Sequence, residues 1–316
     1  MRLAIAQTVC RSLPPIISQR FRNLIYPYNL ARQDNLKLIA KAQTGGSLEG
    51  STKDFYFYPF SIHGYFDWRN VAIAAAIINN GDTIIEIGAN VGTETVSFSD
   101  IVGPKGKVFA FEPVPSNIEW LKKASQLSKF RNIVVKKCAL SSEEGIFNFV
   151  SPPSHASGIG YLAKKGEIID ESIKVKSVTL DSIEREIGKS KLIFIDAEGE
   201  EFNILFGAIN YLNRYRPHVV LEASPKHLER AGSSFEDLYN LLKKLNYNIY
   251  EITRYGLQVV EPENIFNRRQ GKNWLCLSSN SKQLVDSVRK NILRSAISPF
   301  ILGLNPLKAA SFFSND

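Results

Sequence analysis

A seven-residue segment in the first third of the chain has the residue types of a cofactor-binding turn. Residues 86–92 read Glu-Ile-Gly-Ala-Asn-Val-Gly; they follow an apolar run at 83–85 and precede a helix-like stretch at 93–100. Glycines between a strand and a helix let the backbone approach a ligand closely. Glu112 closes a second apolar run at 108–111, where a carboxylate can accept hydrogen bonds from the 2′- and 3′-hydroxyls of a ribose. The pattern therefore predicts a site for a cofactor that contains adenosine.

The residues of the turn favour one such cofactor over the dinucleotides. The dinucleotide fingerprint requires glycine two and five positions after Gly88, but this chain has Asn90 and Thr93 there. The carboxylate of Glu86, just before the turn, would repel a pyrophosphate and attract an ammonium or sulfonium group. S-adenosylmethionine (SAM) carries both cations, so we predict SAM and not NAD. We expect ten residues to contact it, the last three along the adenine: Glu86, Gly88, Ala89, Asn90, Gly92, Glu112, Pro113, Cys138, Ala139 and Leu140.

Strand-like and helix-like segments alternate over the middle of the chain. Apolar runs typical of strands lie near 83–88, 107–112, 132–138, 191–196, 217–223, 247–252 and 273–278. Helical patterns lie near 69–79, 93–101, 115–128, 179–187, 200–212 and 234–244. Such alternation implies right-handed crossovers and a largely parallel sheet, and the last two runs are close enough to pair antiparallel. By analogy of fold, we expect an α/β protein with the seven-stranded, Rossmann-like sheet of class I methyltransferases, its last strand antiparallel.

Three carboxylates follow the fourth and fifth predicted strands: Asp196, Glu198 and Glu222. They should converge, because neighbouring parallel strands end at the same edge of a sheet. Converging carboxylates cannot all ionise cheaply, so either a pKa rises or a divalent metal binds. Methyl transfer to an alcohol benefits from a base that receives the hydroxyl proton. We expect Asp196 to face the methyl donor, and the choice of base between Glu198 and Glu222 stays open; no metal ligand is assigned.

The segment 151–172 is long for a connection inside a compact domain, and loops of this length are often lids or binding loops. It contains His155, which such a lid could deliver as a base, although a lone loop histidine is more often solvated. His63 and His227 have no evident partner in the sequence.

From about Asp67 to Leu277, the chain resembles the FkbM family of SAM-dependent methyltransferases. The resemblance rests on six motifs in order: Gly81-Asp82-Thr83 before residues 86–92, Phe111-Glu112-Pro113, Ala139-Leu140-Ser141 before Gly145, Thr179-Leu180-Asp181-Ser182, residues 195–201 (Ile-Asp-Ala-Glu-Gly-Glu-Glu), and Leu221-Glu222. The resemblance implies SAM-dependent methylation of an oxygen, typically a hydroxyl on a sugar, glycan or secondary metabolite.

The net charge of +8 is concentrated at the two ends of the chain. Residues 1–50 hold seven basic and two acidic residues, and residues 281–316 hold five and two. Amphipathic stripes predict helices at 16–25 (Ile17, Phe21, Leu24) and near the C-terminus (Leu284, Val288, Ile292, Ile297). We therefore predict a basic helical N-terminal arm (1–66), a SAM-binding methyltransferase domain (67–280) and a basic amphipathic C-terminal arm (281–316). The arms either pack on the central domain or contact an anionic membrane surface or a protein partner.

Composition and charge weigh against several classes of protein. Residues 51–280 are electroneutral, which disfavours a nucleic-acid enzyme because such enzymes carry a basic surface around their site. Three cysteines without paired spacing favour a reducing, cytoplasmic setting. The longest apolar run, eight residues, is too short to span a membrane. The alternatives to a small-molecule or glycan methyltransferase are a non-catalytic SAM-binding scaffold and, further behind, a nucleic-acid methyltransferase.

Overall fold

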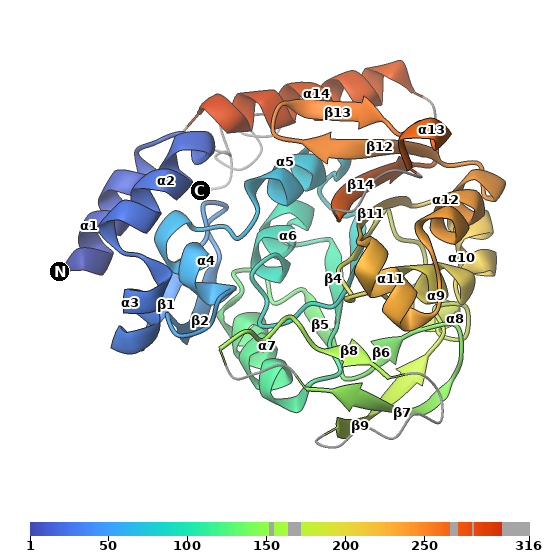
Figure 1. Cartoon of the computed structure of the whole chain (residues 1–316), viewed down its shortest axis with the longest axis horizontal. Helices are drawn as coiled ribbons and strands as arrows, with labels where there is room; N and C mark the ends of the chain where they lie inside the picture. The colour runs from blue at the N-terminus through green and yellow to red at the C-terminus, as the bar shows by residue number, and fades with distance from the viewer. Residues whose placement is uncertain (152–154, 164–171, 266–270, 280, 299–316) are drawn as a thin grey trace.

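An eight-stranded mixed sheet forms the centre of the computed structural model, which describes residues 1–151, 155–163, 172–265, 271–279 and 281–298 (Figure 1). The strand order is β13-β12-β14-β11-β10-β3-β4-β5. The strands are β3 (Thr83–Ile87), β4 (Lys107–Phe111), β5 (Ile133–Lys136), β10 (Leu192–Ile195), β11 (His218–Ala223), β12 (Asn248–Thr253), β13 (Gly256–Val259) and β14 (Lys272–Leu277). The strands from β5 to β11 pair in parallel, and β14 pairs antiparallel with both β11 and β12.

All seven predicted strands are present, and the antiparallel placement of β14 is confirmed. The predicted count of seven was one too low, because β13 forms a hairpin with β12 at the edge of the sheet. Its first residue, Gly256, has φ +144°, a conformation that favours glycine and lets the chain reverse directly after Thr253.

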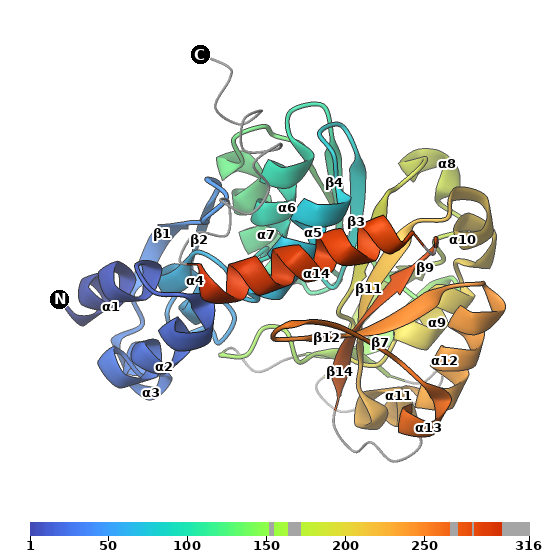
Figure 2. The ribbon, with the colours of Figure 1, turned by 90° about the horizontal axis from the view of Figure 1, so that it is seen from above.

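One face of the sheet is covered by α5 (Trp68–Ile77), α6 (Thr95–Val102) and α14 (Lys282–Ile297). Ile84, Val108, Leu192 and Val220 point to this face, since alternate residues of a strand share a face. The apolar stripe predicted in the C-terminal helix packs here through Val288 and Ile292, and Figure 2 shows α14 lying along α5.

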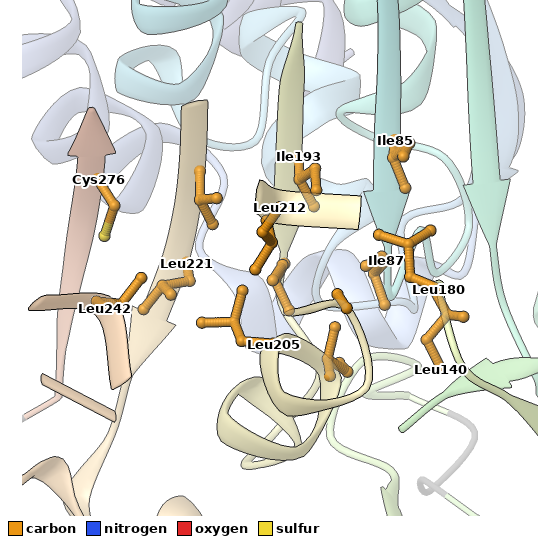
Figure 3. Close-up of a cluster of buried hydrophobic side chains, with 14 of the residues drawn as sticks. Ile85, Ile87, Leu140, Leu180, Ile193, Leu205, Leu212, Leu221, Leu242 and Cys276 are labelled. Carbon is orange, nitrogen blue, oxygen red and sulfur yellow. The ribbon is translucent and has the colours of Figure 1, made fainter. Parts of the chain in front are cut away.

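The opposite face is covered by α9 (Glu201–Phe206), α10 (Ile209–Tyr215) and α12 (Phe235–Lys244). Figure 3 shows Ile85, Ile87, Ile193 and Leu221 of the sheet packed against side chains such as Leu205 and Leu212 of the helices. The helix predicted at 200–212 is in fact two helices, α9 and α10, separated at residues 207–208. The helix predicted at 179–187 is limited to α8 (Glu184–Ile187).

A smaller four-stranded sheet, not predicted from the sequence, adjoins the carboxyl edge of the main sheet. Its strands are β6 (Ala139–Leu140), β7 (Gly145–Val150), β8 (Tyr161–Leu162) and β9 (Ser172–Val178), in the order β6-β9-β7-β8. The predicted loop 151–172 therefore contains β8; its residues 152–154 and 164–171 lie outside the described part of the chain.

The N-terminal segment combines helices with a hairpin and packs on the domain. It contains α1 (Arg2–Arg11), α2 (Pro15–Ile25), α3 (Tyr28–Asp34), β1 (Lys37–Lys41), β2 (Ser47–Ser51) and α4 (Phe57–His63). The hairpin was missed by the prediction of a helical arm. Its Ala40 and Leu48 pack with Val96 of α6 and with Ala124 of α7 (Pro115–Leu127). Part of the predicted C-terminal arm, residues 299–316, lies outside the described residues.

The remaining helices are α11 (Pro225–Ala231) and α13 (Pro262–Ile265). Within the described ranges, each helix is too short or too polar to pass through a bilayer.

Candidate active site

A cavity of about 250 Å³ opens at the carboxyl ends of β3, β4, β10 and β11. Twelve of the thirteen residues predicted from the sequence line it: Glu86, Gly88, Ala89, Asn90, Glu112, Pro113, Cys138, Ala139, Leu140, Asp196, Glu198 and Glu222. Gly92 does not line it. Its Cα instead faces α7, where a methyl group would lie 3.1 Å from Leu121 Cδ1. Gly92 therefore packs against α7, and its assignment to the cofactor stays a prediction.

The turn after β3 is held against the neighbouring strands. The N–H groups of Gly88 and Ala89 donate to the carbonyl of Phe111, both at 3.0 Å. Gly88 has φ +82°, and a Cβ there would lie 1.9 Å from the carbonyl oxygen of Asp196. Only glycine fits this position, because the backbone after β10 crosses directly beside it. The same crossing brings the turn and Asp196 together at one cavity.

Glu112 is fixed at the end of β4 by backbone donors. Its Oε2 accepts from Asn90 N and its Oε1 from Val114 N, each at 2.8 Å, and the residue is only 4% exposed. Burial raises the pKa of the Glu112 carboxyl to about 7, although these hydrogen bonds favour the ionised form. Oε2 keeps a second lone pair, and beside its bond to Val114 N, Oε1 has only a long contact from Asn117 Nδ2 at 3.5 Å. The carboxylate can therefore accept hydrogen bonds from the two hydroxyls of a ribose in the cavity.

Two further carboxylates line the donor side of the cavity, at Glu86 and Glu94. Glu94 was not predicted as a site residue, because the sequence shows it only as a single polar residue before α6. It accepts from Asn70 Nδ2 at 3.0 Å, and burial raises its pKa to about 8. Burial likewise raises the pKa of Glu86, well above the ordinary range. Both side chains need a cationic partner to ionise cheaply.

The cavity fits SAM by the polar atoms that line it. Among the described residues, Glu86 Oε2, Glu94 Oε2 and both polar side-chain atoms of Asn90 are buried without a hydrogen-bond partner. Buried polar atoms of this kind are costly unless a ligand satisfies them. The ammonium and sulfonium of SAM are complementary to the two glutamates, and its hydroxyls and amino-acid carboxylate offer partners to Asn90 and Glu112.

The strand register explains why further carboxylates converge on the same cavity. Phe194 of β10 pairs with Glu86 of β3 and with Val220 of β11. Asp196 and Glu222, two residues further along their strands, share the face of Glu86. Burial, followed by the charges of Glu222 and Glu198, raises the pKa of Asp196 to about 8. The expected rise in a carboxyl pKa is thus present, and Asp196, like Glu198 and Glu222, is half-buried at the cavity wall.

A histidine overlooked in the sequence completes this cluster. His227 of α11 places Nδ1 3.1 Å from Glu198 Oε2 and 3.7 Å from Glu222 Oε2. The expectation that His227 has no partner was wrong, because α11 itself was not predicted. Contact with Glu222 and Glu198 raises the pKa of His227, which favours a protonated imidazole beside the carboxylates. One ligand atom from each of the three side chains lies within 4.8 Å of the others, an arrangement that could alternatively hold a divalent cation.

The N-terminal segment supplies a wall of the cavity through Phe66, whose place before a helix suggested a wall residue, and through Tyr56, which the sequence did not predict. Tyr56 and Phe66 line it, with ring centroids 5.0 Å apart. Burial, and then the charges of Asp196, Glu198 and Glu222, raise the pKa of the Tyr56 hydroxyl, so it remains a neutral group facing the acidic cluster. For Tyr56, the aromatic-rich stretch at 55–60 was the available signal.

The described part of the 151–172 segment lies across the same wall. Ser157, Gly158 and Gly160 line the cavity, and Ser157 N donates to Asp54 Oδ2 at 3.2 Å. The carbonyl of His155 accepts from Tyr28 Oη at 2.9 Å, but the His155 side chain is not among the cavity-lining groups. His63 also has a partner after all: its Nδ1 lies 2.7 Å from Ser18 Oγ, away from the cavity.

The chain is similar in sequence to known methyltransferases. The family model for the methyltransferase FkbM domain matches residues 86–249. The chain is 28% identical to the hexuronic acid methyltransferase AglP of Haloferax volcanii over 177 residues, which are 55% of this chain and 67% of that protein. It is 36% identical over 67 residues to a probable cobalt-precorrin-6B C(15)-methyltransferase of Sulfurisphaera tokodaii, covering 21% of this chain and 35% of that protein.

Among solved structures, an FkbM methyltransferase from Methylobacillus flagellatus aligns with a TM-score of 0.42 and 14% identity, covering 86% of this chain and 57% of that one. The fold assignment rests on the strand order described above.

Proposed function

Since the chain belongs to the FkbM family of methyltransferases, we propose that it transfers the methyl group of SAM to a hydroxyl oxygen of a sugar, glycan or secondary metabolite. SAM is the cofactor of this methyltransferase. The observation that carries the choice of a hydroxyl is the carboxyl cluster of Asp196, Glu198 and Glu222, which lines the same cavity as the cofactor turn.

The residues of the predicted SAM site would bind and orient the methyl donor. Glu112 would hold the ribose, and Glu86 and Glu94 would lie beside the cationic end of the cofactor. SAM supplies a methyl carbon already activated by its sulfonium. Much of the remaining work of the protein is to place the acceptor oxygen in line with that carbon and to exclude water.

The acceptor side receives a proton. An ionised carboxylate whose acid has a pKa of about 8 is a stronger base than an ordinary aspartate, so Asp196 is suited to accept the hydroxyl proton as the oxygen attacks. Glu198 and Glu222 raise that pKa by repulsion, and His227 balances their charge. His227 is therefore a positioning residue, because it contacts the carboxylates from outside the cavity lining.

The same cluster disfavours a carboxylate as the methylated group. An acceptor carboxylate at this position would meet like charges at short range, whereas a hydroxyl would not. The similarity to the hexuronic acid methyltransferase of Haloferax volcanii supports a carbohydrate acceptor. For an acidic sugar, this repulsion therefore favours methylation of a ring hydroxyl, which forms an ether, over methylation of the acid group, which forms an ester.

Product chemistry tests the proposal. The full chain is incubated with SAM labelled in the methyl group and with extracts of small molecules, glycans and lipids, and labelled products are treated with mild base. An ether survives this treatment, whereas an ester is hydrolysed. A base-stable methyl group on a sugar or metabolite oxygen is expected; a base-labile or nitrogen-linked methyl group would refute the choice of a hydroxyl.

A further inference from the structure

A second, larger cleft adjoins the active site. It measures about 740 Å³, and it shares Phe66 and Asp67 with the lining of the first cavity. It lies between α2, the segment before α5, and the turn that joins β12 to β13. Its charged and polar lining comprises Gln19, Arg20, Arg22, Asn23, Asp67, Arg69 and Arg254.

The charge of this cleft is strongly unbalanced. Asp67, its one carboxylate, is already ion-paired with Arg69 at 2.5 Å. Arg20, Arg22 and Arg254 have no carboxylate partner within the described part of the chain; Arg22 donates to the Asn23 amide oxygen and lies over the ring of Tyr58. Three guanidinium groups with free donors therefore surround one hollow. Guanidinium groups are the side chains best suited to bidentate recognition of oxyanions.

Aromatic rings connect the two hollows. Tyr28 and Phe55 line the arginine cleft, Tyr56 lines the active site, and Phe66 lines both. Successive ring centroids along this series are 5.4, 5.7 and 5.0 Å apart. A continuous aromatic wall of this kind suits the apolar faces of sugar rings, so one extended acceptor could reach from the arginines to the acidic cluster.

We propose that the arginine cleft binds a phosphate or diphosphate group carried by the acceptor, so that the substrate is a phosphorylated glycan methylated on a hydroxyl distant from its phosphate. This rests on the proposed function for the reacting end. A phosphate or diphosphate brings about two negative charges, which matches three uncompensated cations better than the single charge of a carboxylate. Two classes of acceptor would present the same phosphate chemistry to the cleft: a sugar nucleotide and an isoprenoid-linked glycan.

Binding measurements on the full chain test the cleft without requiring turnover. S-adenosylhomocysteine first fills the donor site, and inorganic pyrophosphate is then titrated by calorimetry. The double variant Arg20→Gln/Arg254→Gln should weaken pyrophosphate binding about tenfold or more, since each loses a charge-assisted contact. Arg185→Gln, an exposed arginine on α8 far from this lining, is the matched control and should change the affinity less than about twofold. Retained affinity for S-adenosylhomocysteine shows that each variant is folded, and Arg254→Gln alone provides a second test.

The outcomes separate the cleft from the reaction. Absence of pyrophosphate binding, equal binding by the variants and the wild type, or glucuronate binding as tightly as glucose 1-phosphate would overturn the cleft proposal. Tighter binding of uridine diphosphate glucose supports a nucleotide-linked acceptor, and tighter binding of farnesyl diphosphate supports an isoprenoid-linked one. Arginine-dependent binding without any hydroxyl methylation would leave the cleft standing and would remove the proposed reaction. Methylation of neutral glycans that does not depend on the arginines would support the proposed reaction and refute the cleft proposal.

Discussion

Replacement of Glu112 by alanine should weaken SAM binding by a calculable amount. The side chain is buried, lines the cavity and accepts hydrogen bonds from Asn90 N and Val114 N at 2.8 Å each. Loss of its hydrogen bonds to the ribose should cost about 1–3 kcal/mol of binding, which is roughly a 5- to 150-fold increase in Kd. The two backbone N–H groups would also lose their acceptor, so Glu112→Ala should lower the free energy of unfolding by about 2–6 kcal/mol.

Calorimetric titration with SAM separates these two effects when it is performed well below the melting temperature. Circular dichroism establishes that the variant is folded at that temperature. The control is Glu119→Ala on α7, a glutamate whose side chain is 68% exposed and which should leave Kd and stability nearly unchanged. A folded Glu112→Ala protein with the affinity of the wild type would refute the ribose-binding role.

Three other changes test separate parts of the site. Asp196→Asn should lower kcat at least about 100-fold while changing the SAM affinity little; a loss confined to SAM affinity would move Asp196 to the donor side. Burial raises the pKa values of Glu94 and Asp196 to about 8, against about 4 in the unfolded chain. The folded state therefore holds protons more tightly, and the associated stability, complete below about pH 4, should be lost as the pH rises toward about 8. A melting temperature that rises as the pH is raised from about 5 to about 9 would contradict this. Removal of divalent metals with a chelator should leave turnover unchanged, because His227 balances Glu198 and Glu222; activity lost and then restored by Mn²⁺ would show that these three side chains bind a metal instead.

Local patterns were sufficient to predict the strands and the donor side of the site. The side chains of β3, β4 and β10 are buried on both faces of the sheet. Their sequences are therefore continuous apolar runs, which predict strands without reference to the rest of the chain. The turn after β3 and the carboxylate after β4 are set by neighbouring residues, and their placement in one cavity follows from the parallel pairing of the two strands.

The missed features depend on contacts between segments far apart in the sequence. His227 gains its role because α11 folds back over the end of β11 toward Glu198. Tyr56 reaches the cavity because the N-terminal hairpin packs on α6 and α7. The strand β13 is short and half polar, and its pairing with β12 depends on the reversal at Gly256. Periodicity within a single segment contains no information about such packing.

The most direct test of the central claim is a crystal structure of the full chain with S-adenosylhomocysteine. The adenosine should lie across the carboxyl ends of β3 and β4, with its ribose hydroxyls within hydrogen-bond distance of Glu112. The amino group of the homocysteine part should lie beside Glu86 and Glu94. A nucleoside bound elsewhere, or a ribose out of reach of Glu112, would contradict the account.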